Sequence, residues 1–232
     1  MRVIQVISGG AAQGLVGALE RQLADRGLSV SGTFGAVGAM RDKLLAGAPC
    51  DLVILTETII RELEQQGRVV PGSARPVGRV RTGVAVKAGD PMPVVDSASA
   101  LAGVLQRATA IYFPDAVKST AGIHFMGVLR RLGLDGELAP RLRTFPNGAT
   151  AMREMALHGE PGSVGCTQVT EILYTPGVQL AGGLPPEFEL ATVYTAAVST
   201  GAAQAEGARA VAELLASDEA RTVREAGGFD PL

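Results

Sequence analysis

Three loops in this sequence combine small residues with helix starts in a way that suits anion binding. Ser8–Gly14 and Phe34–Met40 each follow an apolar run and open a helix-period stretch, and Lys118–His124 does the same later in the chain. Amides in the first turn of a helix have no partner within it and lie at the positive end of its dipole, so they attract anions. The first loop does not fit G-x-G-x-x-G, and no Gly-Lys-Ser/Thr follows it, which argues against dinucleotide and P-loop sites.

A tight turn between a strand and a helix is the simpler interpretation of any one of these loops. The first two, however, follow neighbouring strands of one expected parallel sheet, and such loops share a crevice. In the third, Ser119 or Thr120 can cap the helix and Lys118 adds a positive charge, although ordinary capping explains the same residues. The candidate ligand residues from the loops are Ser8, Gly9, Gly10, Ala36, Val37, Ser119 and Thr120.

Polar and cationic residues elsewhere extend this set. Arg79 and Arg81 flank Val80, so they share one face of an extended segment, and a guanidinium group matches carboxylate geometry. The alternative to ligand binding is that the arginines lie on a solvated strand edge. For Asn147 the alternative is that it only caps a helix. Cys166-Thr167-Gln168 ends an expected strand, where ligand-binding side chains are common. The further ligand candidates are Arg81, Asn147, Thr167 and Gln168.

Few residues suit a reaction rather than binding. His124 is one of two histidines, and with Lys118 it forms our pair of catalytic candidates, although a core or surface position explains His124 equally well. His158 fits the end of a helix. Neither cysteine has a second Cys or His at metal-ligand spacing, so we expect no metal, no cofactor and no disulfide framework.

The chain alternates between strand-like and helix-like runs. The expected strands are Arg2–Ile7, Ser29–Phe34, Asp51–Leu55, Val84–Val86, Ile111–Phe113, Leu142–Phe145, Val164–Thr167 and Leu190–Val198. The expected helices include Ala121–Leu132, Gly148–Leu157 and a helical tail over Ala205–Ala226. This alternation predicts an α/β fold with parallel, doubly wound sheets.

Two breaks divide the pattern. Gly89–Pro93 is turn-rich, and Pro185-Pro186 interrupts the chain again before a long β-rich run. We therefore predict two doubly wound α/β lobes joined by a hinge. Lobe 1 is discontinuous, residues 1–88 plus 192–232, and lobe 2 spans residues 89–191.

Composition excludes several functional classes. The formal net charge is -2 and tryptophan is absent, so we expect no nucleic-acid partner. The apolar run Val3–Ile7 is too short for the core of a secretory signal, and no segment is long enough to span a bilayer. The chain as written is expected to be cytoplasmic and not inserted in a membrane, or periplasmic if it is a processed form.

The loops resemble those of the molybdate-binding receptors of ABC importers, within the type 2 periplasmic-binding-protein fold. The resemblance covers nearly the whole chain and rests on VISGGAAQGLVGAL, FGAVGAM, LLAGAPCDLVIL, STAGIHFMGVLRRLGL and VGCTQVTEIL. It implies two lobes that close on an oxyanion in the cleft between them, and an ABC permease as partner if the chain is exported. The family's hydroxyl donors are replaced by Ala11, Val37 and Gln168, which favours an organic (poly)carboxylate over molybdate or tungstate.

A second resemblance is to aconitate isomerase, an enzyme that looks like these receptors. It implies an alternative function, isomerisation of an unsaturated polycarboxylate, for which the chain needs anion-binding groups and one base. His124, Lys118, Glu171 and Cys166 all remain open as that base. A transcription co-regulator domain is a third possibility. It is the weaker one, because the sequence contains no recognisable helix-turn-helix segment, which counts against it. The leading prediction is a protein that binds a small anionic ligand.

Overall fold

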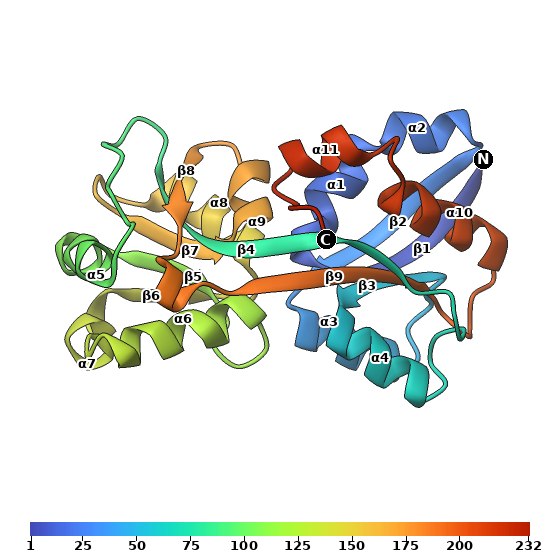
Figure 1. The fold of residues 1–232 in the computed structure, drawn as a ribbon, viewed down its shortest axis with the longest axis horizontal. Coiled ribbons are helices and arrows are strands. Elements are labelled where there is room, and N and C mark those ends of the chain that lie inside the picture. Colours follow the sequence, from blue (N-terminus) through green and yellow to red (C-terminus); the bar gives the residue numbers. More distant parts are fainter. The chain divides into compact units, whose positions relative to one another are not determined.

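The computed structural model describes residues 1–232, and its chain falls into two units (Figure 1). Unit 1 contains Met1–Val80 and Thr192–Leu232, and unit 2 contains Arg81–Ala191. Our sequence-based boundary kept residues 81–88 with the first lobe. In the structure they lie in unit 2, because the second half of strand β4 (Arg75–Lys87) pairs with two strands of that unit.

Unit 1 is built from three parallel strands and one antiparallel strand. Its elements are β1 (Arg2–Gly9), η1 (Gly10–Ala12), α1 (Gln13–Ala18), α2 (Glu20–Asp25), β2 (Leu28–Gly35), α3 (Val37–Leu45), β3 (Leu52–Thr56), α4 (Glu57–Gln65), β9 (Ala191–Val198), α10 (Ala205–Ala216) and α11 (Arg221–Ala226), with the first half of β4. β1 lies between β2 and β3 in parallel register, and β9 pairs with β3 in the antiparallel direction.

The core of unit 1 lies on both faces of this sheet. All five residues of β3 are buried, as the continuous apolar run predicts for a strand covered on both faces. Figure 1 shows α3 and α4 on one side of the sheet and α1, α10 and α11 on the other. A buried carboxylate joins distant segments, since Asp51 accepts the amide of Gln5 at 2.8 Å and that of Gln204 at 2.9 Å.

Unit 2 repeats this arrangement with its own sheet. Its elements are the second half of β4, α5 (Ala98–Arg107), β5 (Ile111–Pro114), α6 (Thr120–Arg131), α7 (Asp135–Leu138), η2 (Ala139–Arg141), β6 (Leu142–Phe145), α8 (Gly148–His158), β7 (Val164–Gln168), α9 (Val169–Tyr174), β8 (Val178–Gly183) and η3 (Pro186–Phe188). β5 is parallel to β6 and β7, whereas β4 runs antiparallel to β7 and β8.

Helices cover both faces of the second sheet. Cys166 packs in one apolar cluster with Phe113 and Phe125, whereas a side chain on the neighbouring Gly165 would meet Met152 and Met155 of α8. Successive strand residues point to opposite faces, so α6 and α8 lie on opposite faces of β7. The predicted α/β class is confirmed.

Candidate functional site

The carboxyl ends of the three parallel strands in unit 1 all lead into helices through small residues. β1 ends at Gly9, β2 at Gly35 and β3 at Thr56, in neighbouring register. Gly9 must be glycine, because a Cβ there would lie 2.9 Å from both Val37 Cγ1 and Tyr194 Cε1. Tyr194, on β9 opposite Thr56, therefore reaches the loop that follows β1.

Helix starts at this edge carry amides without side-chain caps. Neither Ala36, before α3, nor Thr56, before α4, makes a side-chain capping bond. Residues Gly10–Ala12 are buried in η1, which also lacks a side-chain cap. Ser8, predicted to bind ligand, is fully buried, and its hydroxyl donates to Gly9 O at 2.8 Å. The donors that unit 1 offers here are thus backbone amides.

In unit 2 the corresponding feature is the start of α6. Its N-cap, Ser119, is buried and makes no side-chain capping bond. A turn before it is fixed by Asp115, whose carboxylate accepts the amides of Val117 at 2.7 Å and Lys118 at 2.8 Å. These two hydrogen bonds lower the pKa of Asp115, and the bond from the Lys118 amide has the larger effect. A side chain on Gly122 would overlap the carbonyls of Pro114 and Asp115, so glycine allows α6 to begin against this turn.

Beside this helix start lies a group of buried polar side chains that have no partner. Thr82 on β4 and Gln168 on β7 oppose each other in the antiparallel ladder and so point to the same face, the one that α6 covers. They are only 1% and 3% exposed. Thr82 Oγ1 and both amide atoms of Gln168 make no hydrogen bond, and neither does Thr170 Oγ1. We call Thr82, Gln168 and Thr170 the orphan polar cluster.

On the opposite face, the amides at the start of α8 already donate to side chains of the protein itself. Asn147 Oδ1 caps the helix by accepting the Thr150 amide at 2.8 Å. The buried carboxyl group of Glu171 receives the Thr167 hydroxyl at 2.5 Å and the amides of Gly148, Ala149 and Gln168. Burial raises the pKa of Glu171, against the opposing effect of these donors. The side-chain groups predicted to bind ligand at Asn147 and Thr167 therefore have internal partners.

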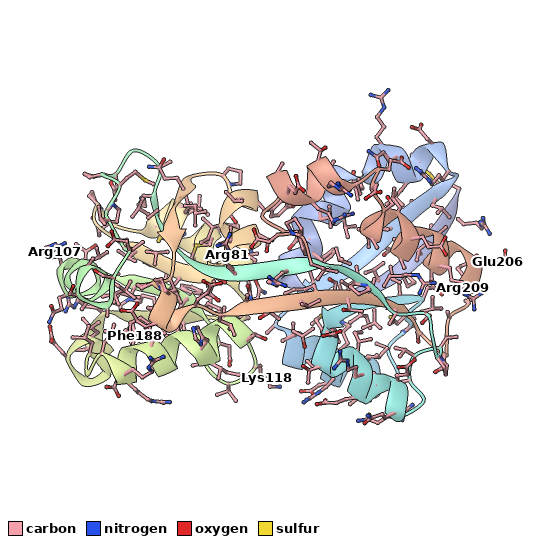
Figure 2. The ribbon with its side chains drawn as sticks, viewed as in Figure 1. Arg81, Arg107, Lys118, Phe188, Glu206 and Arg209 are labelled. Atoms are coloured by element: carbon pink, nitrogen blue, oxygen red, sulfur yellow. The ribbon has the colours of Figure 1, made fainter.

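The two catalytic candidates differ in their surroundings; Figure 2 labels one of them, Lys118, together with Phe188 and Arg81. His124 is half-buried on α6, and its Nε2 lies 2.7 Å from Phe188 O. Since a carbonyl only accepts, Nε2 is the donor in this hydrogen bond, which in a neutral imidazole leaves the lone pair on Nδ1. Lys118 is exposed in the turn before α6, and Arg81 is exposed on β4 beside Thr82.

The cysteines are buried thiols rather than nucleophiles. Burial raises the pKa of Cys50 to about 11, and that of the fully buried Cys166 is raised further. No group of three or more His, Cys, Asp or Glu side chains is close enough to hold a metal ion. No helix is both long and apolar enough to cross a membrane.

The structure thus brings the sequence candidates together within each unit. In unit 1, Gly9, Gly10, Ala36 and Val37 share one edge, and in unit 2 Ser119 and Gln168 do so. Sequence reasoning missed Tyr194, Thr82 and Thr170. Thr82 carried a signal, since it is the polar residue that follows Arg81 and alternates with it on the strand.

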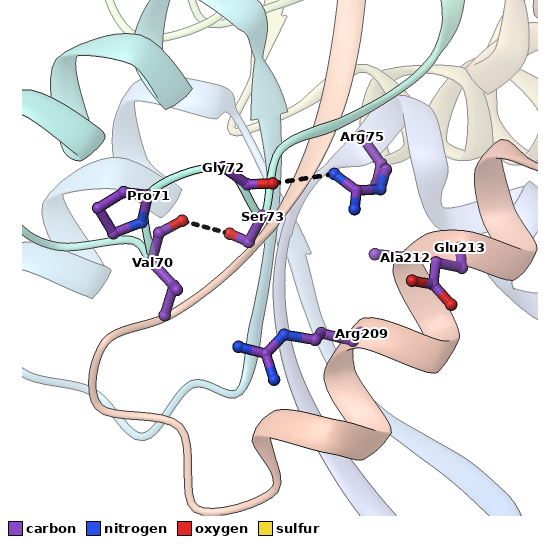
Figure 3. Close-up of a pocket in the computed structure, with 8 residues that line it drawn as sticks. All are labelled: Val70, Pro71, Gly72, Ser73, Arg75, Arg209, Ala212 and Glu213. Carbon is purple, nitrogen blue, oxygen red and sulfur yellow. Dashed lines mark hydrogen bonds between the residues drawn. The ribbon is translucent and has the colours of Figure 1, made fainter.

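A hollow elsewhere in unit 1 has a different character (Figure 3). It has a volume of about 80 Å³ and lies between the turn Val70–Ser73 and α10. Arg75 donates to Gly72 O at 3.0 Å, and Ser73 donates to Val70 O at 2.6 Å. Its lining holds no buried polar side-chain atom without a partner. We therefore do not take it as the functional site.

Comparison with known proteins places this geometry in a family. The profile of the bacterial extracellular solute-binding proteins matches residues 4–230. The chain belongs to this family. Among solved structures, the periplasmic molybdate-binding protein of Azotobacter vinelandii aligns with a TM-score of 0.82 at 20% identity, over 97% of this chain and 98% of that one. The sulfate-binding protein SubI of Mycobacterium tuberculosis H37Rv aligns with a TM-score of 0.76 at 19% identity, over 100% and 88%.

The chain is also similar to an enzyme. An aconitate isomerase from Pseudomonas sp is 26% identical over 195 residues, which cover 84% of this chain and 72% of that protein. The solute-binding fold expected from the loops is therefore confirmed, and the comparisons include both binding proteins and an enzyme.

Proposed function

We propose that this protein binds a small organic anion, a polycarboxylate, through backbone amides at helix starts that follow the carboxyl ends of its strands. The observation that carries the proposal is the set of helices that begin there without a side-chain cap: α3 and α4 in unit 1 and α6 in unit 2. Among the helices that follow strands in unit 2, α8 is by contrast capped by Asn147, whereas α9 also lacks a side-chain cap. Uncapped amides beside a helix dipole supply donors to an anion.

The chemistry of the edges favours a carboxylate over a tetrahedral oxyanion. The Ser8 hydroxyl proton is already used by Gly9 O, and Val37 offers no hydroxyl. Unit 2 adds an exposed arginine, Arg81, whose guanidinium can hold a carboxylate with two hydrogen bonds.

Calorimetric titration tests this function. Succinate, malate, tricarballylate, citrate, cis-aconitate, molybdate and sulfate are titrated into the same protein preparation. We expect di- or tricarboxylates to bind at least tenfold more tightly than molybdate and sulfate. Arg81→Gln should weaken the carboxylates selectively, whereas Arg107→Gln, on the outer helix α5, serves as the matched control. Absence of heat or thermal stabilisation with every carboxylate would exclude the proposal.

A second candidate is an isomerase, which the similarity to aconitate isomerase favours. The reaction moves one proton along an allylic system: a base removes it from the CH2 carbon, the double bond shifts, and a proton returns to the former alkene carbon. No oxidant or cofactor is required. His124 fits the role of base, because the Phe188 carbonyl holds Nε2 as the donor, so that Nδ1 of the neutral ring is the nitrogen that can accept a proton.

Proton NMR in deuterated water tests the isomerase directly. Wild-type protein incubated with cis-aconitate should yield the trans isomer with deuterium at the exchanged carbon. His124→Asn should abolish both signals, and His158→Asn, on the exposed end of α8, should leave them unchanged. If wild type causes neither exchange nor isomerisation, this substrate is rejected while the binding function stands.

A further inference from the structure

The orphan polar cluster is unusual within this fold. Few buried side-chain polar groups in native proteins lack a hydrogen-bond partner, and each one left so costs about 1–3 kcal/mol. Here Thr82 and Gln168 contribute three such atoms, and Thr170, two residues after Gln168 in the sequence, contributes a fourth. Thr82 and Gln168 face each other across one antiparallel pair, with Cβ atoms expected about 5 Å apart. One small ligand group can reach both.

The hydrogen-bonding capacity of these groups restricts that ligand group. Gln168 presents two N–H donors on Nε2 and an acceptor on Oε1, and a threonine hydroxyl both donates and accepts. A carboxylate or another ionised oxyanion accepts only. It would satisfy Nε2 and the hydroxyls but leave the buried Oε1 without a donor.

Neighbouring backbone groups do not fill this gap. The Thr82 amide already donates to Leu190 O at 3.1 Å, and the Thr82 carbonyl accepts from Leu184 N at 3.1 Å. The backbone amide of Gln168 donates to the carboxyl group of Glu171. The Thr82 hydroxyl faces Gln168 but makes no hydrogen bond to it. A ligand hydroxyl can supply the missing donor to Oε1.

We propose that the ligand is a hydroxycarboxylate, and that Thr82 and Gln168 form the subsite that recognises its hydroxyl group. The hydroxyl donates to Gln168 Oε1 and accepts from Gln168 Nε2 or Thr82 Oγ1. The adjoining carboxylate takes the amides at the start of α6, which receive no side-chain cap from Ser119 and lie on the same face of the sheet. This inference rests on the proposed carboxylate-binding function and adds the class of carboxylate.

Ligand pairs that differ by one hydroxyl group test the subsite. Malate is compared with succinate, and citrate with tricarballylate, by calorimetry on the full chain. In wild type the hydroxylated member of at least one pair should bind about 10- to 100-fold more tightly than the member without the hydroxyl. This is the range expected when one ligand makes a buried hydrogen bond and the other leaves the buried group without a partner. In Gln168→Met, which keeps the length of the side chain, this ratio should fall to about one.

Stability without ligand provides an independent readout. Gln168→Met and Thr82→Val replace unpaired buried polar atoms with apolar ones of similar shape, so both should raise the melting temperature of the ligand-free protein. Thr167→Val is the matched control on the same strand. It should lower the melting temperature, because Thr167 donates to Glu171, and it should leave the ligand ratio unchanged.

The outcomes separate this inference from the function on which it rests. Equal affinities within both pairs would overturn the hydroxyl subsite and leave carboxylate binding intact. A hydroxyl preference that survives Gln168→Met would also overturn it, as would a fall in melting temperature in that variant. Failure of all four acids to bind would remove the carboxylate function itself, and the subsite with it.

Discussion

Replacing Gly148 with alanine should destabilise the protein markedly. A Cβ at this position would lie 2.6 Å from Glu171 Cδ and would overlap the carboxyl oxygen Oε2 and the Thr167 hydroxyl. Carbon atoms in contact sit about 3.5–4.0 Å apart, so the carboxyl group must retreat by about 1 Å or more. It then loses the Thr167 hydroxyl and the Gly148 amide, two bonds to a buried acid at about 1.5 kcal/mol each, or about 3 kcal/mol together.

Scanning calorimetry measures this effect. For a chain of this size, about 3 kcal/mol corresponds to a fall of about 6–12 °C in melting temperature. Gly127→Ala is the matched control, since it lies inside α6 with open space around its Cβ position. It should raise the melting temperature by a few degrees, through about 0.5–1 kcal/mol of helix propensity. If Gly148→Ala were also neutral or stabilising, the reading of Glu171 as an acid enclosed at the start of α8 would be wrong.

Three other properties can be measured on the same preparations. Because the pKa of Glu171 is raised in the folded protein, the native state binds more protons than the unfolded one. Stability should therefore fall as pH rises above the ordinary carboxyl pKa of about 4.3, and Glu171→Gln should flatten that slope in urea titrations. Cys50 and Cys166 should resist a thiol reagent at pH 8 until denaturant is added, and rapid labelling of the native protein would contradict their burial. Gly122→Ala should weaken carboxylate binding at least tenfold by pushing α6 off the Pro114–Asp115 turn, and unchanged titration curves would show that this helix start does not hold the ligand.

Local patterns were sufficient for much of the fold. The run at 51–55 reads as a doubly covered strand, and the observed β3 is fully buried. Small residues after each apolar run likewise located the strand ends. Other elements depend on context: β8 carries two glycines and is only partly buried, and it forms by pairing with β4. The sequence predicts a strand at Val84–Val86, whereas β4 already begins at Arg75 and includes Pro76, as proline is tolerated at strand ends and edges.

The site divides along similar lines. Amide-rich loops such as the one at Gly9 are encoded within a few residues and could be predicted. Asn147 and Thr167 were equally plausible from type and position, but packing brings Glu171 to them and gives their neighbourhood an internal acid. Thr82 was not selected from the sequence, because only the pairing of β4 with a distant segment places it opposite Gln168. Predictions failed where partners come from far along the chain.

The divided first unit has a consequence for how the protein is made. Unit 2 is one continuous segment, whereas the core of unit 1 includes Ala196–Val198 on β9 and Val211, Leu214 and Leu215 on α10. Until these residues leave the ribosome, β3 has an open edge and Asp51 lacks the Gln204 amide. The core of unit 1 can therefore be completed only after unit 2 has been synthesised. During that interval an exposed apolar strand is the point at which the nascent chain is most prone to aggregate.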